Sequence, residues 1–260
     1  MIGIADQAYA NPWRTFHPRD KMAFALTTMI LGLVSGVTAC LGIFTAMSYL
    51  AVVRAKIPGR FFLRLYLIPF GFLAMGALSV ALTLSADAAA TIWAIKLGSH
   101  YLGFTPAGLD QASLLLARSG AAVSCLFFLA LTTPWEDINS QLERWGVPYL
   151  LIEMMTLVYR FIFIFWQQAV TIHTAQAARL GHVDFRTSMR SLGGLISSLF
   201  IQTLERTHTM YNSLVARGYT DSLRVLEEER LPIPWSTKLG FIVFDLALIG
   251  LVLAKGSVVS

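Results

Sequence analysis

The sequence predicts an all-α integral membrane protein with about five transmembrane helices and a cytoplasmic helical module inserted before the last of them. Of its 260 residues, 56% are hydrophobic and 13% are charged, whereas about 25% are charged in an average soluble domain. Several uncharged runs approach or exceed the roughly 20 residues that a helix needs to cross a bilayer. The net charge of +5 comes from Lys and Arg beside these runs, which is typical of membrane topology and not of a nucleic-acid-binding face.

The first uncharged run extends from Met22 to Val53. It is too long for one ordinary span and short for two. Ser35 and Gly36 lie near its middle, where small residues suit a tight turn. We therefore expect two short helices, over residues 22–35 and 37–53.

Three later runs complete the predicted set of spans. The third carries Pro69, which we expect to kink it, and the fourth begins at Asp110, a residue type that often caps helix N-termini. The fifth contains the acidic Asp245. These spans cover Phe61–Ser85, Asp110–Thr133 and Leu239–Ala254.

The stretch from Tyr149 to Ile172 is apolar and aromatic but contains Glu153 and Arg160. Basic residues follow it, and the positive-inside rule places them in the cytoplasm. One full crossing at 149–172 would place them outside, so we expect a helix lying at the inner interface; a six-span arrangement is the alternative. The basic residues are Arg179, Arg186, Arg190, Arg206, Arg217, Arg224, Arg230 and Lys238.

The spans divide the chain into three parts. Residues 1–133 hold the N-terminal tail and first four spans, 134–235 form the cytoplasmic module, and 236–260 hold the last span. The N-terminus lacks the pattern of a cleaved signal peptide, so we expect an uncleaved, multi-pass protein of the cell (inner) membrane.

From Leu192 onward, apolar residues of the module recur at helical spacing, with polar residues largely on the other side. Such an amphipathic helix offers an apolar face to a partner. It ends at Gly218, which suits the position after a helix C-terminus. The candidate partner-contact residues are Leu195, Leu199, Tyr211 and Leu214.

Two short segments of the module resemble each other: Ala178-Arg179-Leu180-Gly181 and Ala216-Arg217-Gly218-Tyr219. Each places an arginine beside glycine at an expected helix end. Arginine there is favourable for the helix dipole in any protein, and glycine ends many helices. Two such segments in one module nevertheless favour docking, because a guanidinium beyond a helix tip can reach a carboxylate on another protein.

Catalytic chemistry has no recognisable motif in this sequence. It contains neither a G-x-x-x-x-G-K-[ST] loop nor H-E-x-x-H, and its five histidines lack metal-ligand spacing. Arg118 and Asp245 lie within predicted spans and are therefore candidates for function. A structural pairing of the two, or of Arg118 with a backbone carbonyl, is the simpler interpretation. We expect no catalytic residue and no metal ligand.

The sequence resembles the T components of energy-coupling factor (ECF) transporters, and most closely the cobalt-type CbiQ. The paired arginine segments are similar to the Ala-Arg-Gly motifs of that family. The first departs from the pattern at Leu180, with its glycine one place later. The N-terminal segments Asp6–Ala10, Asn11–Arg14 and His17–Lys21, Leu131-Thr132-Thr133 and Tyr159-Arg160-Phe161 are also similar.

The resemblance implies a non-catalytic membrane scaffold. Coupling helices ending in Arg179 and Arg217 would dock into two ATPase subunits resembling CbiO, which bind ATP and Mg²⁺. The apolar face of the module would hold a substrate-binding subunit resembling CbiM, with a small accessory protein resembling CbiN. Cobalt(II) would be bound by that partner and not by this chain.

Four alternatives differ from this interpretation. The same role could serve nickel or a vitamin. An ordinary ABC permease would contact its ATPase through one short helix, which two separated motifs disfavour. An intramembrane enzyme would need Arg118, Asp245 or Glu153 gathered at one water-filled site. A secondary transporter would show repeats with broken helices, and the sequence shows no repeat.

Overall fold

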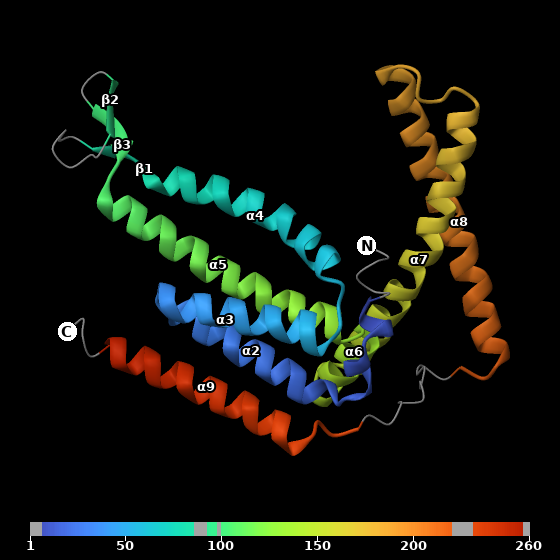
Figure 1. The fold of residues 1–260 in the computed structure, drawn as a ribbon. Helices are drawn as coiled ribbons and strands as arrows, with labels where there is room; N and C mark the ends of the chain where they lie inside the picture. Colours follow the sequence, from blue (N-terminus) through green and yellow to red (C-terminus); the bar gives the residue numbers. More distant parts are fainter. Residues whose placement is uncertain (1–6, 86–92, 98–99, 220–230, 257–260) are drawn as a thin grey trace. The chain divides into compact units, whose positions relative to one another are not determined.

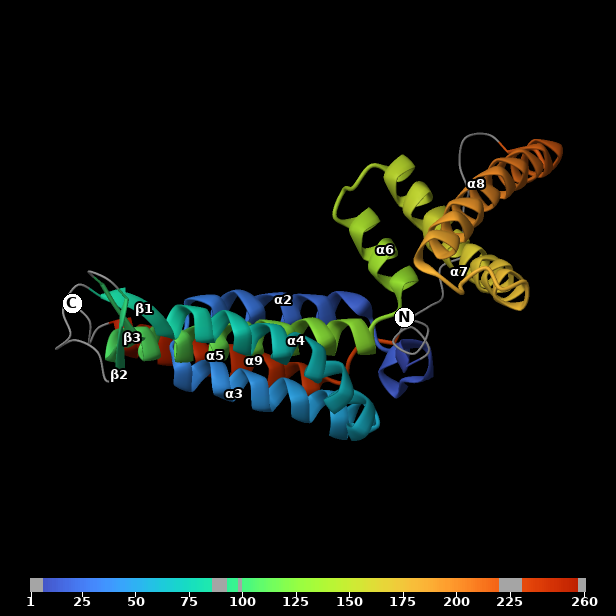
Figure 2. The same ribbon diagram turned by 90° about the horizontal axis from the view of Figure 1, so that it is seen from above.

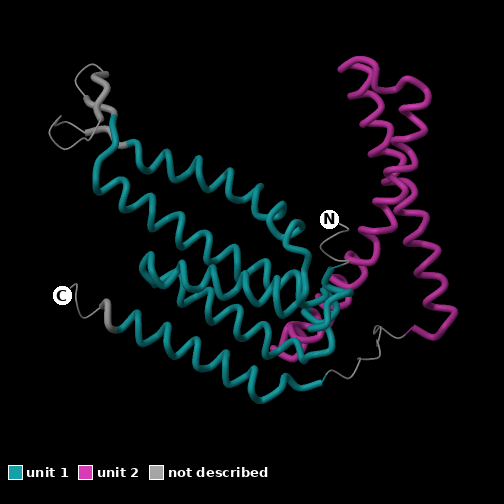
Figure 3. The backbone as a smooth tube through the Cα atoms, viewed as in Figure 1, with its two compact units in different colours: residues 1–138, 229–260 teal, residues 139–228 magenta. Residues whose placement is uncertain are grey.

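The structure is a computed structural model that describes residues 7–85, 93–97, 100–219 and 231–256 (Figure 1). Among the residues named above, Asp6, Arg224 and Arg230 lie outside these ranges. The chain forms two compact units, residues 1–138 with 229–260 and residues 139–228 (Figure 3). The predicted boundaries at 133/134 and 235/236 follow the expected spans and stay predictions.

The first unit is a bundle of long helices that lie side by side (Figures 1 and 2). Helix α5 packs against α2, α3 and α4, and α9 packs against α2. A short 3-10 helix, η1 (Pro12–Thr15), precedes the bundle. The bundle helices are α2 (Pro18–Val34), α3 (Val37–Tyr49), which continues as the π-helix η2 (Leu50–Arg54), α4 (Gly59–Ala81), α5 (Pro106–Thr132) and α9 (Trp235–Gly256).

The expected break in the first apolar run is confirmed at Ser35 and Gly36. The Ser35 N–H still donates to Leu31 O at 3.0 Å, but both residues have extended backbone, so the chain turns there. A Cβ on Gly32 would lie 3.3 Å from Cδ1 of Ile43. The missing side chain therefore lets α2 and α3 approach closely after the turn.

Two expected boundaries are wrong. Helix α5 begins at Pro106, and its N-cap is Thr105, whose hydroxyl accepts from the Gly108 N–H at 3.1 Å; Asp110 lies inside the helix. Pro106 suits the first helical position because its missing N–H would be unpaired there anyway. The helix that follows residue 59 ends at Ala81, before the predicted Ser85.

The chain beyond Ala81 forms a small antiparallel sheet that the sequence analysis did not predict. Its strands are β1 (Leu82–Ser85), β2 (Trp93–Leu97) and β3 (His100–Phe104), in the order β1-β3-β2. The sequence of β2, Trp-Ala-Ile-Lys-Leu, includes the strand-favouring Trp93 and Ile95. This pattern covers only five residues and follows a long apolar run, so it did not stand out in the sequence.

The all-α membrane fold is confirmed. Within the described residues, five helical stretches are long and apolar enough to cross a bilayer: Val37–Arg54, Gly59–Ala81, Pro106–Thr132, Tyr149–Ala178 and Trp235–Leu253. Helix α2 has only 17 residues and is not among these five. Helix α7 (Tyr149–Ala178) is long and apolar enough to cross a bilayer. The interfacial placement of residues 149–172 therefore stays a prediction.

The segment before α2 is anchored at the C-terminal end of α5. The fully buried Lys21 donates from Nζ to Trp13 O and to Thr132 O, both at 3.0 Å. Asn11 Nδ2 donates to Leu131 O at 3.1 Å. Carbonyls in the last turn of a helix have no partner within that helix. These two side chains supply partners to carbonyls at the end of α5.

An aromatic cluster fills the same end of the bundle. Trp13 packs edge-on against Phe128 and close to Phe241, and Phe24 stacks on Phe241 with ring centroids 3.9 Å apart. The Trp13 indole also donates from Nε1 to Arg54 O at 3.2 Å, at the end of η2. One side chain thus contributes both apolar burial and a helix-end hydrogen bond.

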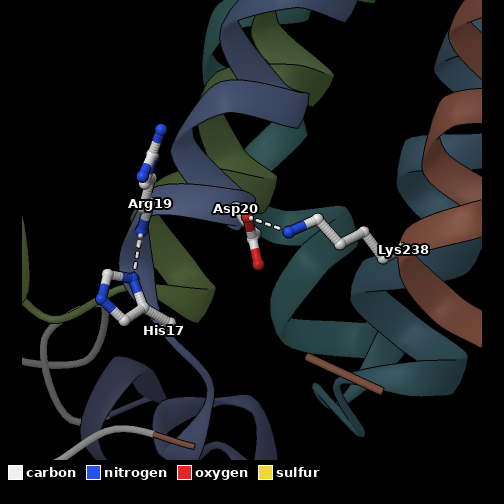
Figure 4. Close-up of polar contacts among 4 residues, drawn as sticks. All are labelled: His17, Arg19, Asp20 and Lys238. Carbon is white, nitrogen blue, oxygen red and sulfur yellow. Dashed lines mark hydrogen bonds and ion pairs between the residues drawn. The ribbon is translucent and has the colours of Figure 1, made fainter. Parts of the chain in front are cut away.

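Figure 4 shows the polar contacts at the start of α2. The His17 ring accepts from the Arg19 N–H at 3.2 Å and so caps the helix. In the same first turn, Asp20 Oδ1 lies 3.0 Å from Lys238 Nζ of α9. The backbone of Leu231, which precedes α9, exchanges hydrogen bonds with Thr15 and His17. Together these contacts join α9 to the N-terminal segment.

The second unit consists of most of α6 (Trp135–Arg144), with α7 and α8 (Phe185–Ala216). Helices α7 and α8 contact each other and cross (Figure 1). The N-cap of α8 is Asp184, whose carboxylate accepts from the Thr187 N–H at 2.6 Å. Hydrogen bonds from the side chain and backbone of Thr187 lower the pKa of Asp184.

Replacing Lys21 with methionine should lower the free energy of unfolding by about 2–4 kcal/mol, because the carbonyls of Trp13 and Thr132 would lose a buried donor. The check is the midpoint of thermal unfolding in detergent, followed by circular dichroism. Arg19→Met is the matched control, because Arg19 is exposed on the same turn of α2. Equal midpoints for the two variants would contradict the anchoring role.

Candidate docking site

Both arginine segments lie at the C-terminal ends of the long helices of the second unit. Helix α7 ends at Ala178 and α8 ends at Ala216, so Arg179 and Arg217 are the two C-cap residues. Their backbone angles nearly coincide, with φ −97° and ψ 18° at Arg179 and φ −94° and ψ 6° at Arg217. The predicted helix end before Gly218 is confirmed.

Each segment closes its helix with the same pair of backbone hydrogen bonds. After Arg179, the Leu180 N–H donates to Ala177 O at 3.0 Å and the Gly181 N–H donates to Gln176 O at 2.8 Å. After Arg217, the N–H groups of the next two residues donate to Val215 O and Leu214 O, both at 3.0 Å. This is the Schellman motif, which fixes the direction in which the chain leaves the helix.

The two caps share a left-handed residue directly after the arginine. It is Gly218, with φ 79°, in the second segment and Leu180, with φ 59°, in the first. A left-handed conformation costs about 1–2 kcal/mol for a residue with a Cβ. Leu180 therefore adopts the conformation that glycine adopts in the second segment, and its departure from the family pattern does not alter the cap.

Gly181 has a different role from Gly218. A Cβ at Gly181 would lie 2.7 Å from Ser191 Oγ and 2.8 Å from Gln176 O. The Ser191 hydroxyl donates to Gly181 O, and Gln176 Nε2 donates to Ser191 O, both at 2.8 Å. Glycine is required here because the turn after α7 packs directly onto α8 and onto its own preceding helix.

The two guanidinium groups are available to a partner. Arg179 and Arg217 are both exposed. Within the ranges that the structure describes, neither side chain has a hydrogen-bond or ion-pair partner. Each therefore presents its five N–H donors from a rigid helix end, an arrangement suited to a carboxylate or to backbone carbonyls of another protein.

Apolar side chains are exposed along both helices. Of the predicted partner-contact residues, Tyr211 is 59% exposed, and Leu195, Leu199 and Leu214 are half-buried. Their contact with a partner stays a prediction. Other apolar side chains of α8 are more exposed than these leucines. They include Ile196, Phe200 and Ile201. An exposed apolar surface of this kind commonly marks an interaction site.

Arg118 and Asp245 do not pair with each other. Arg118 Nε donates to Ser35 O at 3.0 Å and so supplies a partner at the turn after α2. Asp245 accepts from the hydroxyls of Thr27 and Thr28, both at 2.9 Å. The two intramembrane side chains thus join α5 and α9, separately, to the first two helices. Their contacts favour structural roles.

Residues that could hold a metal ion are not gathered in the described part of the chain. No group of three His, Cys, Asp or Glu side chains is close enough to form a metal site there. His173 and His182 stack with ring centroids 4.6 Å apart, but they are only two.

Comparison with known proteins identifies related sequences. The model of the CbiQ cobalt transport protein family matches residues 10–227. A fused cobalt transport protein CbiMQ of Methanocorpusculum labreanum is 32% identical over 97% of this chain, which spans 42% of that protein. The cobalt transport protein CbiQ of Rhodobacter capsulatus is 36% identical over 66% of this chain and 65% of its own length. The CbiQ of Salmonella typhimurium is 30% identical over 84% and 97%, respectively.

Replacing Gly181 with alanine should disrupt the turn between α7 and α8, because the new Cβ would clash with Ser191 Oγ and Gln176 O. We expect faster amide hydrogen exchange in residues 176–191, measured by mass spectrometry. Gly193→Ala is the control, since nothing lies within 4 Å of a Cβ at that α8 position. Unchanged exchange in the Gly181 variant would show that the turn does not need glycine.

Proposed function

Because the chain belongs to the CbiQ family of cobalt transport proteins, we propose that it is the transmembrane coupling subunit of an ATP-driven importer of the ECF type. In this proposal the chain transmits the movements of an ATPase pair to a membrane partner that binds the substrate, and performs no catalysis itself. Cobalt(II) is the substrate that the names of its relatives favour.

The observation that carries the proposal is the equivalence of the two arginine caps. Arg179 and Arg217 have nearly identical backbone angles and the same pair of cap hydrogen bonds. Both are exposed at the ends of different helices. Two equivalent, positively charged helix ends suit two copies of one partner, as in a dimeric ATPase.

The proposed partners are the subunits that would hydrolyse ATP and bind the substrate. ATP and Mg²⁺ would be bound by ATPase subunits resembling CbiO, and cobalt(II) by a subunit resembling CbiM, with an accessory protein resembling CbiN. The relative from Methanocorpusculum labreanum is named as a fusion of CbiM and CbiQ, which supports a lasting association of these two parts. The chain would lie in the cell (inner) membrane, with the unit of α7 and α8 in the cytoplasm.

The proposed mechanism is a change of conformation driven by differential binding. Closing of the ATPase pair on ATP would move the two grooves that hold Arg179 and Arg217. Helices α7 and α8 would move with them, and their exposed apolar side chains would reorient the substrate-binding partner. A ligand shifts such an equilibrium only by the difference in its affinity for the two states, so the energy comes from the ATPase.

Reversing the charge of both arginines should abolish ATPase binding. Each lost contact of a desolvated charge pair costs on the order of 2–5 kcal/mol. The measurement is co-purification in detergent of the tagged chain with its cognate ATPase, for Arg179→Glu, Arg217→Glu and the double variant. We expect partial loss in each single variant and complete loss in the double variant.

Arg206→Glu is the matched control, because Arg206 is exposed on α8 and lies ten residues before the helix ends at Ala216. This variant should retain the ATPase. A double cap variant that reaches the membrane and still binds the ATPase as the wild type does would refute the docking role.

A further inference from the structure

Helix α8 lacks the apolar burial that would hold it in place. None of its 32 residues is buried. A helix of this length measures about 48 Å, at about 1.5 Å per residue. The turn contacts among Gln176, Gly181 and Ser191 hold only its first part against α7. A small change of angle at the turn would therefore displace Arg217, at the far end, by many ångströms.

A hydrogen bond between side chains ties that far end back to α7. The Tyr219 hydroxyl donates to Glu153 Oε1 at 2.7 Å, across 66 positions of the chain. Tyr219 is the second residue after Arg217, and its own N–H closes the α8 cap on Leu214 O. The tyrosine is thus fixed to the helix end by its backbone and to α7 by its side chain.

The accepting carboxylate of Glu153 lies in an unusual environment, because it is buried. Glu153 is only 7% exposed, in the second turn of α7. Its other oxygen, Oε2, has no hydrogen-bond partner in the part of the chain that the structure describes. Burying an unpaired carboxylate is costly. Among those residues, the Tyr219 hydroxyl is the donor that offsets the cost of burying the Glu153 carboxylate. Breaking this hydrogen bond would leave the buried carboxylate without a partner, so the bond is favoured.

We propose that Tyr219 and Glu153 form a latch that positions Arg217 for docking. The inference rests on the proposed function and deepens it. The latch closes the pair of α7 and α8 at the end opposite the turn, so that both arginine caps belong to one rigid frame. A pull on either cap then moves both helices together. Tyr219 is a positioning residue, and it acts through Arg217.

The test is a double-mutant cycle on ATPase affinity, measured in detergent with the tagged chain and its cognate ATPase. Tyr219→Phe removes only the hydroxyl and should weaken binding by about tenfold, the effect expected for a hydrogen bond to a buried carboxylate. In an Arg217→Ala background, the same change should have less than about a twofold effect, because no positioned arginine remains.

Conservative and control variants separate positioning from folding. Glu153→Gln keeps an acceptor oxygen for Tyr219 and should stay close to the wild type, whereas Glu153→Leu should match Tyr219→Phe. Tyr49→Phe removes the same group and should change nothing, because Tyr49 is exposed on α3. Hydrogen exchange should increase at residues 214–219 in Tyr219→Phe and not at the turn of residues 176–191.

Two outcomes would overturn the latch. The first is that Tyr219→Phe binds the ATPase as tightly as the wild type does. The second is that Tyr219→Phe weakens ATPase binding equally with and without Arg217. Failure of the proposed function is distinguishable from either, because Arg217→Glu itself would then keep the ATPase. In that case the positioning role fails together with the docking role.

Discussion

Carbonyl groups at the C-terminal ends of helices are the constraint on which this structure depends. Each helix leaves its last carbonyls without partners in the helix, and this chain satisfies them in two ways. In the bundle, side chains distant in sequence reach them, as Lys21 and Asn11 do for α5. At the ends of α7 and α8 the backbone turns back on itself and satisfies them locally. The first solution holds the bundle together, and the second leaves an arginine exposed at each tip.

The two units therefore differ in what stabilises them. The bundle has an aromatic and aliphatic core around Phe128 and Ile43, both fully buried. The pair of α7 and α8 has little buried apolar surface, and hydrogen bonds near its two ends hold it, at Ser191 and at Tyr219. Helices fixed in this way can move as a frame without exposing a core, because they have little core to expose. That property suits a part that must follow a moving partner while keeping two contact points at a fixed separation.

The small residues Ser35, Gly36 and Gly218 predicted the break in the first apolar run and the end of α8, and hydropathy predicted the positions of the long helices. Hydropathy missed the three-stranded sheet. It is averaged over about 20 residues, whereas each strand has only four or five. It placed the start of α5 at Asp110, although Thr105 and Pro106 supply the cap. The left-handed conformation of Leu180 could not be predicted from its residue type, because leucine rarely adopts that conformation. The contact from Tyr219 to Glu153 joins residues 66 positions apart, and a single sequence carries no local pattern for such a pair.

The central claim is that both caps contact an ATPase at the same time, and site-directed cross-linking tests it most directly. Ala178→Cys and Ala216→Cys each place an exposed thiol beside a cap arginine without removing it, and both native cysteines are buried. With a short reagent that has one thiol-reactive end and one photoactivated end, each single variant should cross-link one ATPase chain in the assembled complex. The double variant should yield a product of one coupling chain with two ATPase chains. A double variant that cross-links only one ATPase chain, or none, would contradict the account.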